Sequence, residues 1–180
     1  MATSSPQESD TPELRVGHGY DLHRLDPDAD RPLVIGGVRL EHDRGPIARS
    51  DGDVLLHAAT DAVLGALALP DIGELFPDTD HTNEARDSGD FLAEAVRLAA
   101  ERGYHPVNLD STVVLERPRL KPVKGEIRAN LARLLGLPPE AVNVKGKTHE
   151  RVDAVGEGRA VEAHAVVLMR RTGTDRGGRR

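Results

Sequence analysis

The sequence predicts an α/β fold: a two-layer sandwich of one mixed β-sheet with helices packed on one face. Segments with the residue period of a strand alternate with segments with the period of a helix along the 180 residues. Only 2% of the residues are aromatic, so aliphatic side chains and alanine must fill the core. No linker rich in Ser and Gly divides the interior, which indicates a single catalytic domain over residues 14–170.

Runs of alternating or β-branched apolar residues predict the strands. Two of these runs are short and flank Gly36-Gly37, a pair typical of a hairpin turn. In order along the chain, the predicted strands are residues 14–23, 32–35, 38–40, 107–115, 142–148 and 161–169.

Capping and helix-breaking residues mark the predicted helices. Ser50 or Asp51 can cap the first helix, and Pro70 follows its end. Gly103 and Gly136 end the other two. In order, the predicted helices are residues 50–69, 88–102 and 121–135.

Composition excludes several classes of protein. The net charge is −6, and no dense stripe of Lys and Arg argues for a nucleic-acid partner. The apolar stretches are too short to cross a bilayer, and residues 1–13 are polar and acidic, unlike a secretory signal. We therefore expect a cytoplasmic protein with disordered tails at residues 1–13 and 171–180. The basic second tail could contact nucleic acid, but a solvated tail is the favoured interpretation.

Asp21 and His23 are the first candidate metal ligands, since without cysteine only His, Asp and Glu remain. On a strand, residues two apart point to the same face, so these side chains can converge on one ion. His57 is the third candidate, because Asp53, His57 and Asp61 share one face of the first predicted helix. Three ligands would leave a catalytic zinc ion its open position. Either helix aspartate could hold the other His57 nitrogen; the alternative is a hydrogen-bonded core histidine beside surface aspartates.

The start of this helix is a candidate phosphate site. Ser50, Asp51 and Gly52 lie where helix N–H groups are free, and the cation Arg49 precedes them. The alternative is a simple N-cap, which is compatible with phosphate binding.

Two further segments carry candidate ligand-binding groups. The acidic loop at 71–80, with Phe76 among its acids, could grip a polyol or be an ordinary surface loop. Lys147 and Thr148 could hold phosphate oxygens, and Glu150 could bind Mg²⁺. The alternative for this second segment is a solvated run of charges.

Four motifs in this order resemble the 2-C-methyl-D-erythritol 2,4-cyclodiphosphate synthase family of non-mevalonate isoprenoid biosynthesis. The resemblance covers about residues 15–169. The motifs are Gly17-His18-Gly19-Tyr20-Asp21-Leu22-His23, Ser50-Asp51-Gly52-Asp53-Val54-Leu55-Leu56-His57, Asp71-Ile72-Gly73-Glu74-Leu75-Phe76-Pro77-Asp78-Thr79-Asp80 and Lys147-Thr148-His149-Glu150.

The resemblance implies a homotrimer with active sites between subunits. It implies one zinc ion per subunit on Asp21, His23 and His57, and Mg²⁺ or Mn²⁺ on Glu150. The expected catalytic residues are Asp21, His23, His57, Arg49, Ser50, Lys147, Thr148 and Glu150. The expected substrate-binding residues are Asp61, Asp71, Ile72, Gly73, Phe76, Pro77, Asp78, Leu115, Pro118, Arg119, Leu120 and Gly146, of which 115–120 match the cytidine pocket.

The implied reaction closes a ring. The 2-phosphate of 4-diphosphocytidyl-2-C-methyl-D-erythritol 2-phosphate attacks its own β-phosphorus, giving the cyclic diphosphate and CMP. No protein nucleophile is needed, in agreement with the absence of cysteine. The alternatives are a zinc-dependent phosphodiesterase or pyrophosphatase, in which water attacks, and an inactive module that binds CMP or isoprenoid phosphates.

The sequence departs from the family pattern at two places. Arg49 stands where many members have His, and its guanidinium should keep phosphate binding with altered geometry. The stretch 155–158 is shorter than in bacterial members and lacks their arginine, which is associated with isoprenoid diphosphates in the trimer's central cavity. Residues 147–153 resemble the plant-type branch.

Overall fold

The computed structural model describes residues 13–77 and 79–172. Nearly all of the two predicted tails, at 1–12 and 173–180, and the predicted site residue Asp78 lie outside the described residues. Glu13 and Arg171, assigned to the tails from the sequence, are described: the backbone N–H of Arg171 donates to the Glu13 carbonyl over 2.9 Å.

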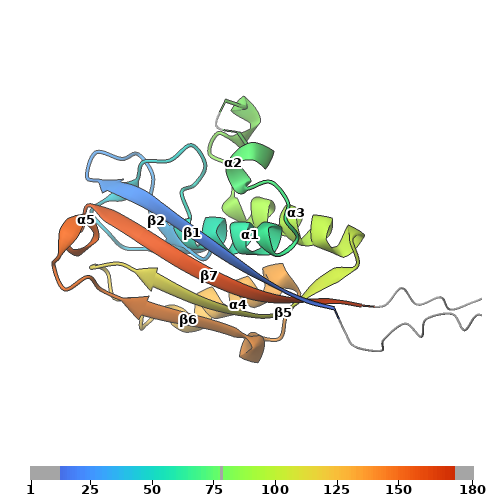
Figure 1. Cartoon of the computed structure of the whole chain (residues 1–180). Coiled ribbons are helices and arrows are strands. Elements are labelled where there is room, and N and C mark those ends of the chain that lie inside the picture. Colours follow the sequence, from blue (N-terminus) through green and yellow to red (C-terminus); the bar gives the residue numbers. More distant parts are fainter. Residues whose placement is uncertain (1–12, 78, 173–180) are drawn as a thin grey trace, which may run out of the picture.

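Within the described residues, a mixed sheet of five strands forms one layer, in the order β4-β1-β7-β5-β6. Its long strands β1 and β7 run side by side (Figure 1). Only β5 and β6 are parallel; the other neighbours are antiparallel. The strands are β1 (Leu14–Asp26), β4 (Gly45–Pro46), β5 (Tyr104–Val114), β6 (Val142–Lys147) and β7 (Ala160–Arg171). The predicted α/β fold with a mixed sheet is confirmed.

The predicted hairpin pairs separately from this sheet. Its strands β2 (Leu33–Ile35) and β3 (Val38–Leu40) are antiparallel and are joined at Gly36 and Gly37, both of which have positive φ. Glycine adopts that backbone conformation without steric cost.

Three long helices form the second layer: α1 (Val54–Ala66), α3 (Ser88–Glu101) and α4 (Lys124–Leu135). Helix α1 packs on β1 and β7, α4 packs on β6, and α3 contacts both helices. The turn α2 (Ile72–Leu75) lies in the acidic loop predicted at 71–80, and η1 (His81–Asn83) follows that loop. The turns η2 (Pro139–Ala141) and α5 (Asp153–Gly156) lie beside β6 and β7. No helix among the described residues has the length and apolarity that a bilayer span requires.

Helix α1 begins four residues later than predicted, because Asp53 and not Ser50 or Asp51 is its N-cap. The fully buried Asp53 carboxylate accepts hydrogen bonds from the N–H groups of Leu55 and Leu56. It also accepts from Gly36 and Gly37 over 2.8 and 2.6 Å. One carboxylate therefore caps the helix and ties it to the hairpin.

The odd-numbered residues of β1 face α1, and two of them are glycines. A Cβ atom on Gly17 would lie 1.8 Å from the Ala62 carbonyl oxygen, and one on Gly19 would lie 1.9 Å from that of Ala58. No side chain fits there, so the helix backbone rests directly on the strand. The next inward positions of the same strand, Asp21 and His23, consequently lie beside the first turns of the helix.

Replacing Gly19 with Ala should destabilise the fold by about 3 kcal/mol, because the helix backbone must move away from the strand. Replacing Gly65 with Ala is the matched control: its Cβ would meet only the His18 carbonyl, at 3.7 Å. That change should stabilise the protein by up to about 1 kcal/mol through helix propensity. Urea unfolding of both variants measures the difference, and equal effects of the two changes would contradict the close-packing argument.

Candidate active site

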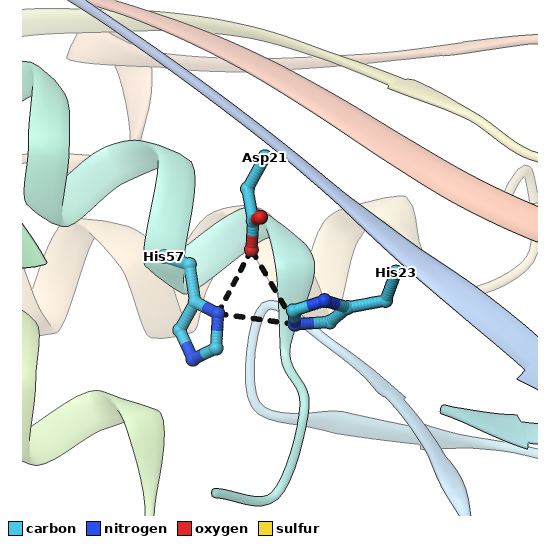
Figure 2. Close-up of side chains that lie close together, drawn as sticks. All are labelled: Asp21, His23 and His57. Carbon is cyan, nitrogen blue, oxygen red and sulfur yellow. Dashed lines mark hydrogen bonds and ion pairs between the residues drawn. The ribbon is translucent and has the colours of Figure 1, made fainter. Parts of the chain in front are cut away.

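Asp21, His23 and His57 converge on one point (Figure 2). His57 Nδ1 lies 2.9 Å and His23 Nε2 lies 3.4 Å from Asp21 Oδ2, and the two nitrogens are 3.1 Å apart. Ligand atoms about 2.0–2.1 Å from a tetrahedral ion lie about 3.3 Å from each other. The three atoms thus already form one face of such a tetrahedron. Among the described residues, no other three His, Cys, Asp or Glu side chains bring their ligand atoms this close together.

The elements around the triad set its geometry. Asp21 and His23 lie two residues apart on β1 and point to the same side, as predicted. His57 lies in the first turns of α1, and only 8% of its surface is exposed. A rigid strand and a packed helix therefore hold the ligands.

The protonation equilibria of the triad are coupled by its charges. Burial favours the neutral Asp21 carboxyl, but the hydrogen bond to His57 and the charge of His23 outweigh it and lower the Asp21 pKa. Burial lowers the pKa of His23, against the pull of Asp21. Burial also acts to lower the pKa of His57, yet the carboxylates, Asp21 foremost, raise it. A metal requires an ionised Asp21 and two neutral imidazoles, so its binding would displace the proton that the carboxylates favour on His57.

Two serines, rather than the predicted aspartates, contact the outer nitrogen of His57. Its Nε2 lies 2.8 Å from Ser88 Oγ and 3.1 Å from Ser50 Oγ. The prediction that Asp53 or Asp61 holds this nitrogen is wrong. Asp53 is occupied by four backbone N–H groups, and Asp61 accepts a hydrogen bond from the Ile72 N–H over 2.8 Å. From the sequence, Ser88 was only the first residue of a helix.

A cavity of ≈ 310 Å³ opens beside the triad. The predicted residues that line it are Asp21, His23, Arg49, Ser50, His57, Ile72, Gly73 and Phe76. The lining residues that the sequence did not reveal are Ile47, Ala48, Asn83 and Phe91. Of these, Phe91 stacks on Phe76 with ring centroids 4.6 Å apart, and the Arg86 guanidinium lies over both rings. One wall of the cavity is therefore aromatic, while the triad side is polar.

Arg49 brings a cation to this cavity. Its Nε is buried and has no hydrogen-bond partner among the described residues. The carbonyl of Arg49 accepts a hydrogen bond from Arg31 Nη1 over 2.8 Å, which fixes the backbone ahead of α1. A buried guanidinium N–H without a partner costs free energy unless a ligand atom accepts from it.

The residues predicted to bind cytidine and a second metal ion lie close to one another, but they do not line the triad cavity. The Leu115 N–H donates to the Lys147 carbonyl over 3.0 Å, and Leu120 packs beside Gly146. Both segments follow the parallel strands β5 and β6, whose carboxyl ends meet at one edge. The exposed Glu150 accepts a hydrogen bond from Thr148 Oγ1 over 3.1 Å. None of these residues lines the triad cavity of the same chain.

Several of the remaining predicted site residues have local structural partners. Asp71 caps α2 by accepting from the Glu74 N–H over 2.9 Å. The carbonyl of Pro77 accepts from Asn83 Nδ2 over 3.1 Å. The side chains of Leu115 and Leu120 belong to the hydrophobic core, whereas Pro118 and Arg119 are at least partly exposed.

The YgbB family model matches residues 14–170, nearly every described residue. The chain belongs to the YgbB family. It is 56% identical over 158 residues to the chloroplastic 2-C-methyl-D-erythritol 2,4-cyclodiphosphate synthase of Oryza sativa, covering 88% of this chain and 70% of the relative. It is 50% identical to the enzyme of that name from Dechloromonas aromatica, covering 89% of this chain and 99% of the relative.

Among solved structures, that of IspF from Plasmodium falciparum in complex with CDP matches this YgbB-family chain with a TM-score of 0.78. The two are 33% identical, and the match covers 89% of this chain and 97% of that one. The resemblance inferred from the four sequence motifs is confirmed. The predicted cytoplasmic location stays a prediction, since plant relatives are chloroplastic.

Replacing His57 with Ala should abolish binding of a divalent metal ion, because two ligands on one strand cannot complete a tetrahedral site. Metal content per chain, measured by mass spectrometry after dialysis, should fall from one ion to none. Replacing the exposed His105 of β5 with Ala is the control and should leave one ion bound. Full occupancy in the His57 variant would sink the ligand assignment.

Proposed function

We propose that the chain is a 2-C-methyl-D-erythritol 2,4-cyclodiphosphate synthase, a phosphorus–oxygen lyase that releases CMP. Its substrate is 4-diphosphocytidyl-2-C-methyl-D-erythritol 2-phosphate, and its product serves isoprenoid precursor biosynthesis. The observation that carries the proposal is the Asp-His-His triad opening onto a cavity lined by Arg49 and Ser50, in a chain of this family.

Asp21, His23 and His57 would hold a zinc ion, whose ligand preferences they match in atom type and in spacing. When bound, the zinc ion polarises the β-phosphate and neutralises part of its charge. The side chains hold their donor atoms in place before any ligand arrives, so little reorganisation is needed at the moment of reaction.

Arg49 and Ser50 would position the phosphate groups. The unpartnered Nε of Arg49 can donate to a phosphate oxygen, and its permanent charge replaces the donor that His supplies in other members. Ser50 lies at the cavity wall with its hydroxyl 3.1 Å from His57 Nε2. Because attacking and leaving groups belong to one molecule, folding the flexible substrate into an in-line pose can supply up to about 10 kcal/mol.

The segment after α1 would bind the methylerythritol part. Ile72, Gly73 and Phe76 line the cavity, and their backbone is set by α2 and by the Asp61 hydrogen bond to Ile72. Asp71 and Pro77, which neighbour these residues in the sequence, and Asp78, which lies outside the described residues, would bind it as well. Carboxylates and free backbone groups are suited to the hydroxyls of a polyol.

A neighbouring subunit would supply the cytidine half of the site. The segments 115–120 and 146–150 lie together on the chain but outside its own triad cavity. Lys147 and Thr148 would hold nucleotide phosphate oxygens. Glu150 would bind Mg²⁺ or Mn²⁺, which would supply positive charge beside the CMP leaving group. Leu115, Pro118, Arg119, Leu120 and Gly146 would recognise the base mainly through backbone groups.

A homotrimer would bring the two halves together. The face of the sheet opposite the helices exposes apolar side chains: Val16 is 66%, Tyr20 46% and Leu22 44% exposed, all on β1. Val166 of β7 extends this face. An apolar sheet face of this kind favours contact with further copies of the chain.

Product analysis tests the proposed reaction. Incubation of the zinc-loaded protein with the substrate and Mg²⁺ should give a cyclic diphosphate in ³¹P NMR spectra and one CMP per turnover. Linear phosphates would instead indicate a phosphodiesterase or pyrophosphatase. Absence of CMP release under multiple turnover would indicate a binding module and contradict the proposal.

Mixing two inactive variants tests the shared site. His57→Ala removes the triad, and Glu150→Gln removes the second carboxylate. If each site joins His57 of one subunit to Glu150 of the next, random co-assembly of equal amounts restores about a quarter of the sites. The mixture should therefore show about a quarter of wild-type activity, while each variant alone shows almost none. No recovery in trimers shown to be mixed would mean that each chain carries its own complete site.

A further inference from the structure

Two serine hydroxyl groups lie within hydrogen-bond distance of the outer ring nitrogen of His57, although that nitrogen can form only one hydrogen bond as a donor. Nδ1 faces Asp21 and His23, and Nε2 faces Ser88 Oγ at 2.8 Å and Ser50 Oγ at 3.1 Å. When Nδ1 is the metal ligand, the ring proton resides on Nε2, which can donate one hydrogen bond. The two serines therefore cannot have the same role.

The hydrogen of the Ser88 hydroxyl is committed to a carboxylate. Ser88 Oγ donates to Asp51 Oδ1, and the Ser88 backbone N–H donates to Asp51 Oδ2 over 3.1 Å. A hydroxyl has one hydrogen and two lone pairs, so Ser88 can offer His57 only a lone pair. Ser88 is thus fixed as the acceptor of the His57 Nε2–H.

Ser50 is in a different state. Its Oγ accepts the Gly52 N–H over 3.2 Å, and within the described residues its hydroxyl hydrogen meets no carboxylate or carbonyl oxygen. With the Nε2–H directed to Ser88, the Ser50 hydroxyl remains able to donate into the cavity that it lines.

The acceptor is rigidly held. Ser88 is fully buried and is the first residue of α3, whose N-cap is Asp87. Asp51 also accepts from the Asp53 N–H over 3.1 Å, and its own N–H donates to the Arg86 carbonyl over 3.0 Å. The start of α3 and the segment ahead of α1 are thereby joined directly behind His57.

We propose that Ser88, oriented by Asp51, is the positioning residue that fixes the ring of His57 and frees Ser50 to donate to a substrate phosphate. The inference rests on the proposed metal site, and it assigns Ser88 as the hydrogen-bond partner of the third ligand, His57. Outer hydrogen bonds of this kind raise the basicity of a metal-binding imidazole and fix its tautomer.

Zinc affinity of the full-length, metal-free protein tests the proposal, with zinc ion and a competing chelator as the only probes. Ser88→Ala should raise the zinc dissociation constant about 10–100-fold. Ser50→Ala should leave it within about threefold while raising KM for the substrate. Asp87→Ala is the matched control: it removes the cap one residue away, which accepts the Gly89 N–H over 2.7 Å, without touching His57. It should lower the unfolding temperature but keep zinc affinity.

A spectroscopic readout separates orientation from general loosening. In ¹⁵N-histidine NMR of the zinc-loaded protein, the His57 Nε2–H should be visible and protected from exchange, and Ser88→Ala should remove that protection. Wild-type affinity and protection in Ser88→Ala would overturn the assignment, as would a large loss of affinity in Ser50→Ala alone. Failure of the wild-type protein to bind zinc would instead contradict the proposed metal site itself.

Discussion

The site depends on the direct contact between the backbones of β1 and α1. Gly17 and Gly19 leave no room for a side chain, so the carbonyls of Ala62 and Ala58 rest on the strand. The strand and the helix then run in opposite directions at fixed separation. The same inward face that carries the glycines carries Asp21 and His23 further along, level with the first turns of the helix. His57 is brought within 2.9 Å of Asp21 by that contact, and not by a flexible loop.

The triad brings three potential metal-ligating atoms together, and without an ion the hydrogen bond between His57 and Asp21 holds two of them. Two imidazole nitrogens and a carboxylate oxygen lie within about one tetrahedral edge of each other, and His57 is almost buried. A bound divalent ion would displace the proton of that hydrogen bond and take all three atoms as ligands. Around them, Asp53 holds the start of α1 against the hairpin, and Asp51 joins it to α3. Asp51 and Asp53 therefore form different tertiary contacts, although both are aspartates at the start of the same helix.

The candidate ligands could be predicted from the sequence because their spacing determines which side chains share a face of a strand or a helix. Positions two apart on a strand share a face, so Asp21 and His23 could be paired before the fold was known. The helical spacing of Asp53, His57 and Asp61 added His57, and the motif resemblance added the residues around it. Contacts between distant segments could not be predicted from the sequence: Ser88 contacts His57 across 31 positions, and Asp53 binds Gly36 across 17.

The spacing of four residues suggested that Asp53 or Asp61 is hydrogen-bonded to His57. Both carboxylates instead accept tertiary hydrogen bonds, Asp53 from Gly36 and Gly37 and Asp61 from Ile72. Phe91 of α3 and Asn83 of η1 line the cavity through the tertiary fold, which no local sequence pattern indicates.

The strand-and-helix contact holds the two imidazoles and the one carboxylate of the proposed zinc centre. X-ray absorption at the zinc edge, on protein loaded with one zinc ion per chain, tests it most directly. We expect a four-coordinate ion with two imidazole ligands and oxygen ligands at about 2.0–2.1 Å. A six-coordinate oxygen shell, or a spectrum with fewer than two imidazoles, would contradict it.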